Sequence, residues 1–272
     1  MGARTKDTEN FPVGSWLVAA PLRPTVHAFY AFARTADDIA DDPHLPAGEK
    51  VRRLEAMDAQ LQGGPGEGPA ATIRDRLAEI GVPIVHCREL LVAFVRDANK
   101  PRTADWADLM DYCRYSASPV GRFLLDLHGE SRDTWEASDA LCNALQVLNH
   151  LQDCGDDYRA LDRVYLPLDA FAAAGADVAE LDAAKSSPAL RRVLDRTIAD
   201  TRPLVEAARA LPAGIRSGGL KREAAVIVAI AERLLEKLAR RDPLAERVEL
   251  GKFAVLGAAL AGLGRTLVPG GR

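Results

Sequence analysis

Four aspartates fall within six positions of the segment RTADDIADD, which spans residues 34–42 and is followed by Pro43. Carboxylates near the C-terminal end of a helix oppose its macrodipole, and like charges four residues apart repel each other. These aspartates therefore do not serve to cap or stabilise the helix. Carboxylate oxygens are the ligands that Mg²⁺ prefers, and Mg²⁺ held by one or two carboxylates usually also binds phosphate oxygens. The segment predicts a magnesium and polyphosphate site, with a solvated acidic surface as the alternative.

A second acidic stripe follows more than a hundred residues later, in QVLNHLQDCGDDYR at residues 146–159. Leucines at 141, 145, 148 and 151 form a separate apolar face that can enter a core. If the two stripes face each other across an interior, their carboxylates repel strongly unless cations lie between them. Oxygen ligands without a cysteine or a suitable histidine pair select Mg²⁺. At helical spacing the polar residues of this second stripe are Gln146, Asn149, Asp153, and Asp156 or Asp157.

Helices must position both stripes, and the sequence predicts helices almost throughout. Apolar residues recur at spacings of three and four, and nothing alternates like a strand. Prolines separate the periodic segments, residues 62–69 and 211–220 are predicted loops, and residues 170–184 are predicted short helices. We therefore expect an all-α fold of about ten helices around one interior. The predicted helix over residues 25–42, opened by Pro24, places on one stripe Tyr30, Arg34, Asp37 or Asp38, and Asp41.

Composition and charge narrow the function classes. The 272 residues are 48% hydrophobic and contain no linker, which favours one domain over residues 1–272. The net charge of −4, with basic residues scattered among acids, argues against nucleic acid as a partner. Four cysteines without a C-x-x-C pair indicate neither a zinc site nor a disulfide framework, and fit a reducing cytoplasm.

The sequence has no signal-peptide pattern and no apolar run long enough for a spanning helix. The nearest approach is FAVLGAALAGL at residues 253–263, for which we expect a buried helix, with contact to a lipid surface as the alternative. The five histidines lack a metal-binding arrangement and are expected to be surface or satisfied residues. We expect a cytoplasmic protein, soluble or peripheral to a membrane.

Three segments resemble the squalene/phytoene synthase family in the expected order. They are FYAFARTADDIADD at residues 29–42, YCRYSASPVG at 112–121, and NHLQDCGDDYRALDRVYLP at 149–167, and the similarity extends from residue 10 to about residue 253. Two paired aspartate motifs are far more specific than either one alone. Within the family, these segments and ENFPVGSW near the start are most similar to the hydroxysqualene-forming members of bacterial hopanoid biosynthesis.

The resemblance implies an isoprenoid synthase fold in which the two aspartate motifs face each other across a central apolar cavity and bind a prenyl diphosphate through Mg²⁺. The positions that match catalytic residues of the family are Asp37, Asp38, Asp41, Asp153, Asp157 and Tyr112. The substrate-binding positions that we infer from the match are Tyr30, Arg34, Asn149, Gln152, Arg163, Tyr165, Ser116 and Ser118. The implied metal ligands are Asp37, Asp38, Asp41, Asn149, Asp153, Asp156 and Asp157.

The implied activity is ionisation of presqualene diphosphate, rearrangement of the carbocation, and capture by water to give hydroxysqualene and diphosphate. Two departures from the wider family favour this activity. Gln152 stands where many condensing members carry an arginine, and Ser116, Ala117 and Ser118 replace a V-A-G sequence, with Pro119 predicting a helix kink. We expect Ser116, Ser118 or Tyr115 to position the water.

Aromatic rings of the cavity are expected to stabilise the carbocation by about 0.5 to 2 kcal/mol each. The candidates are Phe29, Phe32, Tyr112 and Phe123. The resemblance also implies handover of the substrate from a presqualene diphosphate synthase, and of the product to a hydroxysqualene reductase.

Three alternatives remain open. Within the family, the chain could be a presqualene diphosphate synthase, or a squalene or phytoene synthase that joins two prenyl diphosphates. An all-α Mg²⁺-dependent nucleotide pyrophosphohydrolase would need basic or stacking groups for a base, whereas both motifs here have apolar flanks. A non-catalytic acidic surface predicts exposed motifs that bind no Mg²⁺. No G-x-G-x-x-G segment follows a strand, so a nucleotide reductant site is not indicated.

Overall fold

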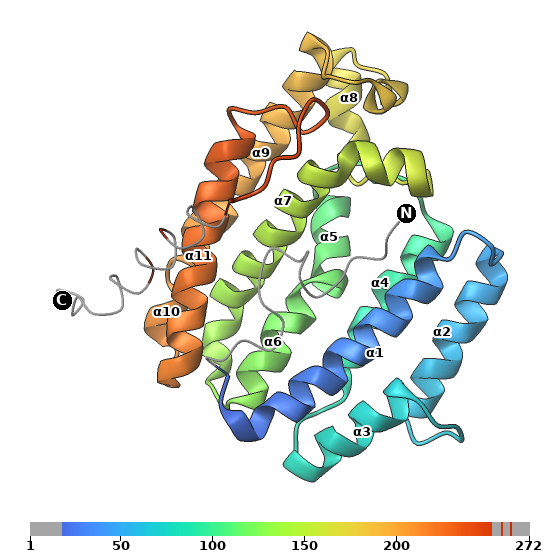
Figure 1. Ribbon diagram of the computed structural model, residues 1–272, viewed down its shortest axis with the longest axis vertical. Helices are drawn as coiled ribbons and strands as arrows, with labels where there is room; N and C mark the ends of the chain where they lie inside the picture. Colours follow the sequence, from blue (N-terminus) through green and yellow to red (C-terminus); the bar gives the residue numbers. More distant parts are fainter. Residues whose placement is uncertain (1–17, 252–256, 258–261, 263–272) are drawn as a thin grey trace.

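The computed structural model describes residues 18–251 together with Gly257 and Gly262, and this part of the chain is helical (Figure 1). It contains eleven α-helices, and its one β-type pairing is an isolated bridge between Arg102 and Val164. The prediction of an all-α fold with about ten helices is therefore confirmed. The α-helices are α1 (Arg23–Asp41), α2 (Ala47–Leu61), α3 (Pro69–Ile80), α4 (Val85–Asn99), α5 (Trp106–Ser116), α6 (Ser118–Leu127), α7 (Trp135–Leu161), α8 (Leu168–Ala174), α9 (Pro188–Ala208), α10 (Leu211–Gly214) and α11 (Gly218–Leu238).

Local sequence signals explain most helix boundaries. Pro24 lies in the first turn of α1 and Pro69 begins α3, where a missing backbone N–H costs nothing. The predicted loop at 62–69 and the short helices predicted at 170–184 are confirmed by the gap before α3 and by α8 with the 3₁₀ helix Val178–Asp182. The predicted loop at 211–220 is wrong, because this segment contains α10 and the first residues of α11.

The segment around Pro119 forms a break between two helices, where the sequence predicted a kink within one helix. Ala117 separates α5 from α6 and has φ −123° and ψ −50°. A proline lacks the N–H of the helical hydrogen bond, and its ring clashes with the carbonyl four residues earlier. Pro119 therefore occupies the first turn of α6, and a new helix begins there.

Two large hydrophobic clusters form most of the core of the described residues, and a small third one contains Ala229 and Ile230. One joins α1, α2, α3, α4 and α6, and the other joins α5, α7, α9 and α11. The long helix α7 supplies the fully buried Leu148 and Leu151 to the second cluster, and burial of each such side chain contributes about 1.5 to 3 kcal/mol. Helix α6 belongs to both clusters, through Phe123 and Leu125. The helices α1 and α7 therefore border the space between the two clusters.

None of the helices among the described residues is both long and apolar enough to cross a bilayer. The apolar segment at 253–263 lies outside the described residues, apart from Gly257 and Gly262, and so does ENFPVGSW near the start.

Candidate active site

The first aspartate motif lies in the last two turns of α1, and Arg34 holds two of its carboxylates. The Arg34 guanidinium lies 3.3 Å from Asp37 Oδ2 and 2.9 Å from Asp38 Oδ1. The side chain of Asp38 is 60% exposed and that of Asp37 is 40% exposed, so both remain open to a ligand. Helical spacing of three and four residues accounts for both contacts.

Arg163 ties the segment after the second motif to the end of the first. Its Nη1 atom lies 2.5 Å from Asp41 Oδ1, and its Nη2 atom donates to the carbonyl of Ala40 at 2.9 Å. The Arg163 side chain is buried, which opposes its charge, but the neighbouring Tyr165, Asp97 and Asp41 keep its pKa above the ordinary value. Arg163 is therefore a permanent cation beside the carboxylates of α1.

Asp97 of α4 accepts hydrogen bonds from two predicted site residues. The Tyr112 hydroxyl donates to Asp97 Oδ2 at 2.8 Å, and the Tyr165 hydroxyl donates to Oδ1 at 2.9 Å. The ring of His150 stacks on that of Tyr165, with centroids 3.8 Å apart. Burial raises the pKa of Asp97 to about 6, although Arg163 and both phenols oppose the shift. Burial, with the charge of Asp97 next, raises the pKa of both phenols, which therefore act as neutral donors.

The sequence interpretation missed Asp97, although a signal was present. Leu90 and Phe94 form an apolar stripe on α4, and Asp97 continues it at the next helical position. An acid on the core-facing stripe of an amphipathic helix requires hydrogen-bond partners, because burial without them is costly. The two tyrosines, which lie 15 and 68 residues further along the chain, are these partners.

Electrostatic interactions connect the first motif with Asp97, and Tyr165 with the second motif. Burial, followed by the charge of Asp41, raises the pKa of Asp37 to about 7 against the opposing effect of Arg34. Asp97 adds to this shift, so it faces the carboxylates of α1. On the other side, Asp157 of the second motif contributes to the raised pKa of Tyr165. Charged groups of α1, α4 and α7 therefore act on one another here, and together they are called the carboxylate recess below.

The second motif is only partly directed at this recess. Asp153 and Asp157 are half-buried on α7, as is Asn149. Asp156, which the sequence left open as an alternative to Asp157, has a side chain that is 77% exposed and lies 2.7 Å from Arg159. Successive residues of a helix point about 100° apart, so the two neighbours cannot share one face.

Gln152 has a structural partner. Its Nε2 atom donates to the carbonyl oxygen of Val248 at 2.6 Å, across 96 residues of sequence. The position where condensing relatives were expected to carry an arginine thus anchors the segment after α11 to α7.

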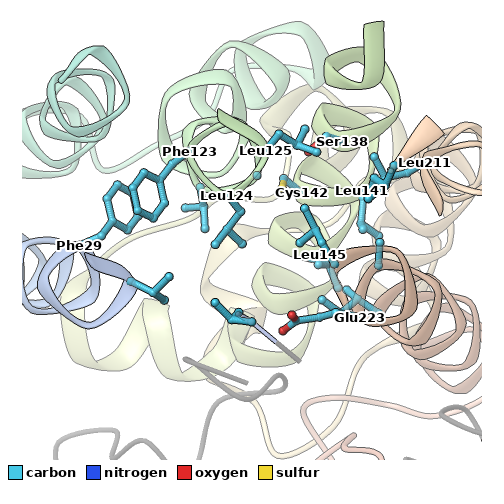
Figure 2. Close-up of a pocket in the computed structure, with 18 of the residues that line it drawn as sticks. Phe29, Phe123, Leu124, Leu125, Ser138, Leu141, Cys142, Leu145, Leu211 and Glu223 are labelled. Carbon is cyan, nitrogen blue, oxygen red and sulfur yellow. The ribbon is translucent and has the colours of Figure 1, made fainter. Parts of the chain in front are cut away.

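An apolar cavity of about 260 Å³ lies between the two core clusters, bounded by α1, α6, α7, α10 and α11 (Figure 2). Tyr30 and Ala33 line it one turn before Arg34 and Asp37. Similarly, Leu145 lines it one turn before Asn149 on α7. The two helices that carry the aspartate motifs therefore also form part of the cavity wall. On each helix, the residues that line the cavity precede the motif in sequence.

Two of the four aromatic candidates line this cavity. The rings of Phe29 and Phe123 line it and stack with their centroids 3.9 Å apart and their planes within 5° (Figure 2). Phe32 is fully buried in the core and does not line the cavity. Tyr112 does not line the cavity either, and its hydroxyl donates to Asp97.

Neither Ser116 nor Ser118 lines this cavity. Ser118 is buried and donates to Asn143 Oδ1 at 3.0 Å, so its hydroxyl joins α6 to α7. The Ser116 hydroxyl is buried with no hydrogen-bond partner among the residues described. Tyr115 is half-buried, and the guanidinium carbon of Arg114 lies over its ring, 5.2 Å from the centroid.

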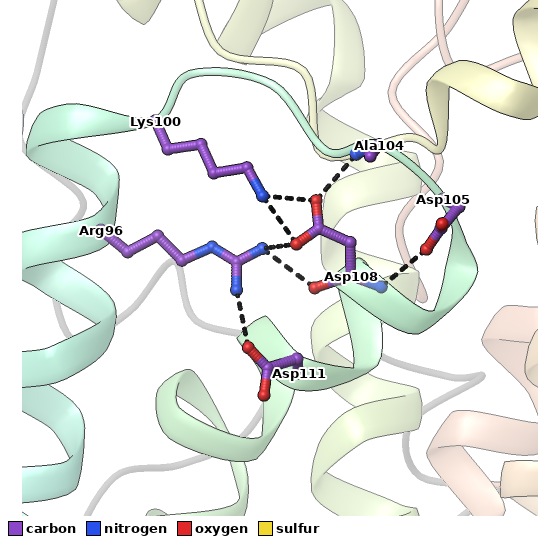
Figure 3. A network of polar contacts seen from close by, with 6 residues as sticks. All are labelled: Arg96, Lys100, Ala104, Asp105, Asp108 and Asp111. Atoms are coloured by element: carbon purple, nitrogen blue, oxygen red, sulfur yellow. Dashed lines mark hydrogen bonds and ion pairs between the residues drawn. The ribbon is translucent and has the colours of Figure 1, made fainter.

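A network of charged groups fixes the end of α4 against the start of α5 (Figure 3). Asp108 Oδ1 lies 2.6 Å from Arg96, and Lys100 lies 2.6 Å from Oδ2, which also accepts from the backbone N–H of Ala104 at 2.8 Å. The Arg96 guanidinium lies over the Tyr112 ring, 5.3 Å from its centroid. Arg96 thus contacts both this network and the ring of Tyr112, whose hydroxyl donates to Asp97.

The residues present fit a divalent cation that is shared with a ligand. No three His, Cys, Asp or Glu side chains in the described part of the chain are placed to hold one metal ion by themselves. Mg²⁺, however, is usually bound by one or two carboxylates, with waters and phosphate oxygens completing its six ligands. Burial is the largest cause of the raised pKa of Asp37, but the charges of Asp41, Asp38 and Asp97 also raise it, and a cation would relieve this repulsion.

Comparison with known proteins identifies the class. The model of the squalene/phytoene synthase family matches residues 4–254, and the chain belongs to this family. It is 50% identical to a hydroxysqualene synthase of Rhodopseudomonas palustris, over 91% of this chain and 85% of the relative. It is 46% identical to the enzyme of the same name from Zymomonas mobilis, over 94% of this chain and 88% of the relative.

Solved structures agree with this assignment. A squalene synthase HpnC from Alicyclobacillus acidocaldarius superposes with a TM-score of 0.75 at 31% identity, covering 87% of this chain and 90% of that one. A dehydrosqualene synthase in complex with a ligand superposes with a TM-score of 0.81 at 20% identity, covering 96% and 93%, and shows the shared fold. The chain is thus a prenyl diphosphate-processing enzyme, and members of its family generally depend on divalent metal ions.

Proposed function

We propose that the protein is a hydroxysqualene synthase, which converts presqualene diphosphate and water into hydroxysqualene and diphosphate. The observation that carries this proposal is the position of the apolar cavity, which begins one helical turn from the carboxylate recess on both α1 and α7. A substrate with a C30 hydrocarbon chain and a diphosphate group requires an apolar cavity for the chain and, beside it, a site that binds the diphosphate through metal ions. Relatives of that name, 45–50% identical over most of the chain, support the choice of activity.

The residues proposed to hold Mg²⁺ are Asp37, Asp38 and Asp41 of α1 and Asn149, Asp153 and Asp157 of α7. When bound, Mg²⁺ would neutralise the charge that develops on the departing diphosphate. Arg34 and Arg163 would add fixed positive charge at the same place, and such preorganised electrostatics commonly contributes several kcal/mol to catalysis. Tyr112 and Tyr165, held by Asp97, would orient hydroxyl groups towards the recess.

The carbocation would then lie in the apolar cavity, away from bulk water. The stacked rings of Phe29 and Phe123 present aromatic faces there, each able to stabilise a cation by about 0.5 to 2 kcal/mol. The same cavity argues against a nucleotide substrate, because no arginine or lysine is among the described residues that line it.

We also propose that the enzyme is cytoplasmic and works at the membrane periphery, because both substrate and product are C30 lipids. Direct handover from a presqualene diphosphate synthase and to a hydroxysqualene reductase would keep these lipids out of water.

The decisive experiment is incubation of the pure protein with presqualene diphosphate or with farnesyl diphosphate, each with Mg²⁺, with and without NADPH. Hydroxysqualene from the first substrate alone, in equal amounts with and without NADPH, is the expected result. Formation of presqualene diphosphate from farnesyl diphosphate would instead identify a presqualene diphosphate synthase. Formation of squalene that requires NADPH would identify a complete squalene synthase, and either outcome would overturn the proposal.

A further inference from the structure

Glu223 of α11 is the one acidic or basic side chain among the described residues that line the apolar cavity. Its neighbours on the same helix face, Leu220, Ala224 and Ile227, are apolar and line the cavity with it. The Oε2 atom of Glu223 is buried. A carboxyl group in the wall of a lipid-sized cavity can bind a water molecule beside an apolar substrate, which the apolar side chains around it cannot do.

Glu223 lies on a different helix from the residues of the carboxylate recess. The recess is built on α1, α4 and α7, whereas Glu223 projects from α11 (Figure 2). In this view it lies at the opposite end of the cavity from the stacked rings of Phe29 and Phe123. A diphosphate held in the recess would thus place the hydrocarbon part of its molecule between the aromatic pair and this carboxyl group.

We propose that Glu223 binds the water molecule that captures the rearranged carbocation and accepts its proton, and this inference rests on the proposed function. The water oxygen donates an electron pair to the cationic carbon and forms the new C–O bond. One O–H bond of that water then breaks, its electrons stay on oxygen, and the proton passes to the carboxylate. The products are the neutral alcohol and a protonated Glu223, which returns the proton to solvent.

The other polar groups of the cavity wall suit this role less well. Burial raises the pKa of Cys142 to about 12, so its thiol is protonated and cannot accept a proton at neutral pH. Ser138 and Tyr30 can donate or accept hydrogen bonds but are weak bases. The serines of the α5–α6 break do not reach the cavity, and the Ser118 hydroxyl is already bonded to Asn143.

The first test is the product distribution of Glu223→Gln with presqualene diphosphate and Mg²⁺. Glutamine keeps the shape and the hydrogen-bonding groups but cannot take the proton. The ratio of hydroxysqualene to C30 hydrocarbon is expected to fall by about 10- to 100-fold, because the trapped cation then loses a proton from carbon. Glu223→Asp, which retains a carboxyl group, should recover part of the ratio.

Glu236→Gln serves as the matched control, since Glu236 is an exposed carboxyl group on the same helix. Its product ratio should equal that of the wild type. An unchanged ratio in Glu223→Gln would overturn the inference while leaving the proposed function intact. If the wild type forms no hydroxysqualene at all, the proposed function fails first.

A second test needs neither Mg²⁺ nor turnover. N,N-Dimethyldodecylamine is a protonated, cationic lipid that imitates the charge of the intermediate, and dodecanol is a neutral lipid of the same chain length. By calorimetry, Glu223→Gln should bind the amine about 10-fold more weakly than the wild type, because a charged hydrogen bond is lost. Dodecanol should bind both proteins equally. Equal binding of the amine to both would contradict a role for the Glu223 charge.

Discussion

At the scale of single residues, the site depends on one acid that two tyrosines share. Each Asp97 oxygen accepts from one phenol, and the charge of Asp97 also acts on Arg163 and Asp37. Bonds to an ionised acceptor are about twice as strong as neutral ones. Asp97 thus positions Tyr112 and Tyr165 through hydrogen bonds, and its charge disfavours ionisation of Asp37.

Tyr112→Phe is expected to lower the free energy of unfolding by about 1 to 3 kcal/mol, because it removes a hydrogen bond to a buried carboxylate. A double-mutant cycle identifies the cause. In an Asp97→Ala background the same change should cost less than about 0.5 kcal/mol, since the bond no longer exists. Thermal unfolding of the four proteins measures both values. Tyr115→Phe is the control on the same helix, and equal costs in the two backgrounds would exclude the proposed coupling.

At the scale of helices, the α4–α5 junction shows how a polar network serves the site from outside it. Arg96, Lys100 and the N–H of Ala104 converge on Asp108, whose side chain is only 17% exposed (Figure 3). Burial alone would raise the pKa of Asp108, but these three partners outweigh it and hold the pKa below its ordinary value. The network therefore stabilises the protein only while Asp108 is ionised.

Asp108→Ala is expected to lower the free energy of unfolding at pH 7 by about 1 to 3 kcal/mol, because the largely buried Arg96, the exposed Lys100 and a backbone N–H lose their partner. A lowered folded-state pKa means that this stabilisation is present above the unfolded pKa and is lost as the pH falls through the folded one. The difference from wild type, followed by thermal unfolding, should therefore shrink in acid. Asp111→Ala, at a side chain that is 58% exposed, should cost less than about 0.5 kcal/mol.

Diphosphate release should also slow in Asp108→Ala, since Arg96, which lies over the Tyr112 ring, would lose the partner that fixes it there. A destabilised variant with wild-type kinetics would show that the junction supports the fold alone. Thermal stability and the rate of diphosphate release together distinguish a positioning role of Asp108 from a purely structural one.

The sequence predicted these elements to different degrees. The α1 boundaries followed from Pro24 and Pro43, and the apolar and acidic stripes of α7 followed from helical spacing. The split between α5 and α6 could not be told from a kink, because Pro119 is compatible with both. The choice between Asp156 and Asp157 also stayed open, since the helix phase depends on how α7 packs against α9 and α6.

At the scale of the whole molecule, the site forms where two core clusters meet. The cavity draws its walls from five helices, and its acidic recess joins α1, α4 and α7. Glu223 lines the cavity, and Asp97 binds Tyr112 and Tyr165, only because the fold brings together segments that are distant in sequence, about which local patterns carry no information. The resemblance supplied the aspartate motifs residue by residue, but it did not indicate that Gln152 anchors the segment at Val248.

Collecting acids in one recess lowers the stability of the folded protein. Burial raises the pKa of Asp97 to about 6 and that of Asp37 to about 7, so ionising either group is less favourable in the folded chain than in the unfolded one. Such a cost persists where the charge is needed for function, as for binding a cation.

The pH dependence of stability should reveal this cost at Asp97. Its folded pKa of about 6 exceeds the ordinary value of 3.8, so the folded state binds more protons between these values and loses stability as the pH rises through them. Asp97→Asn removes this loss. Relative to wild type, the variant should therefore gain about 2 kcal/mol between pH 4.5 and 7.5, or about 4 to 8 °C in melting temperature. Tyr112→Phe should act in the opposite direction, because the Tyr112 hydroxyl lowers the pKa of Asp97. A difference between Asp97→Asn and wild type that stays constant with pH would show that Asp97 is ionised in the folded protein without this cost.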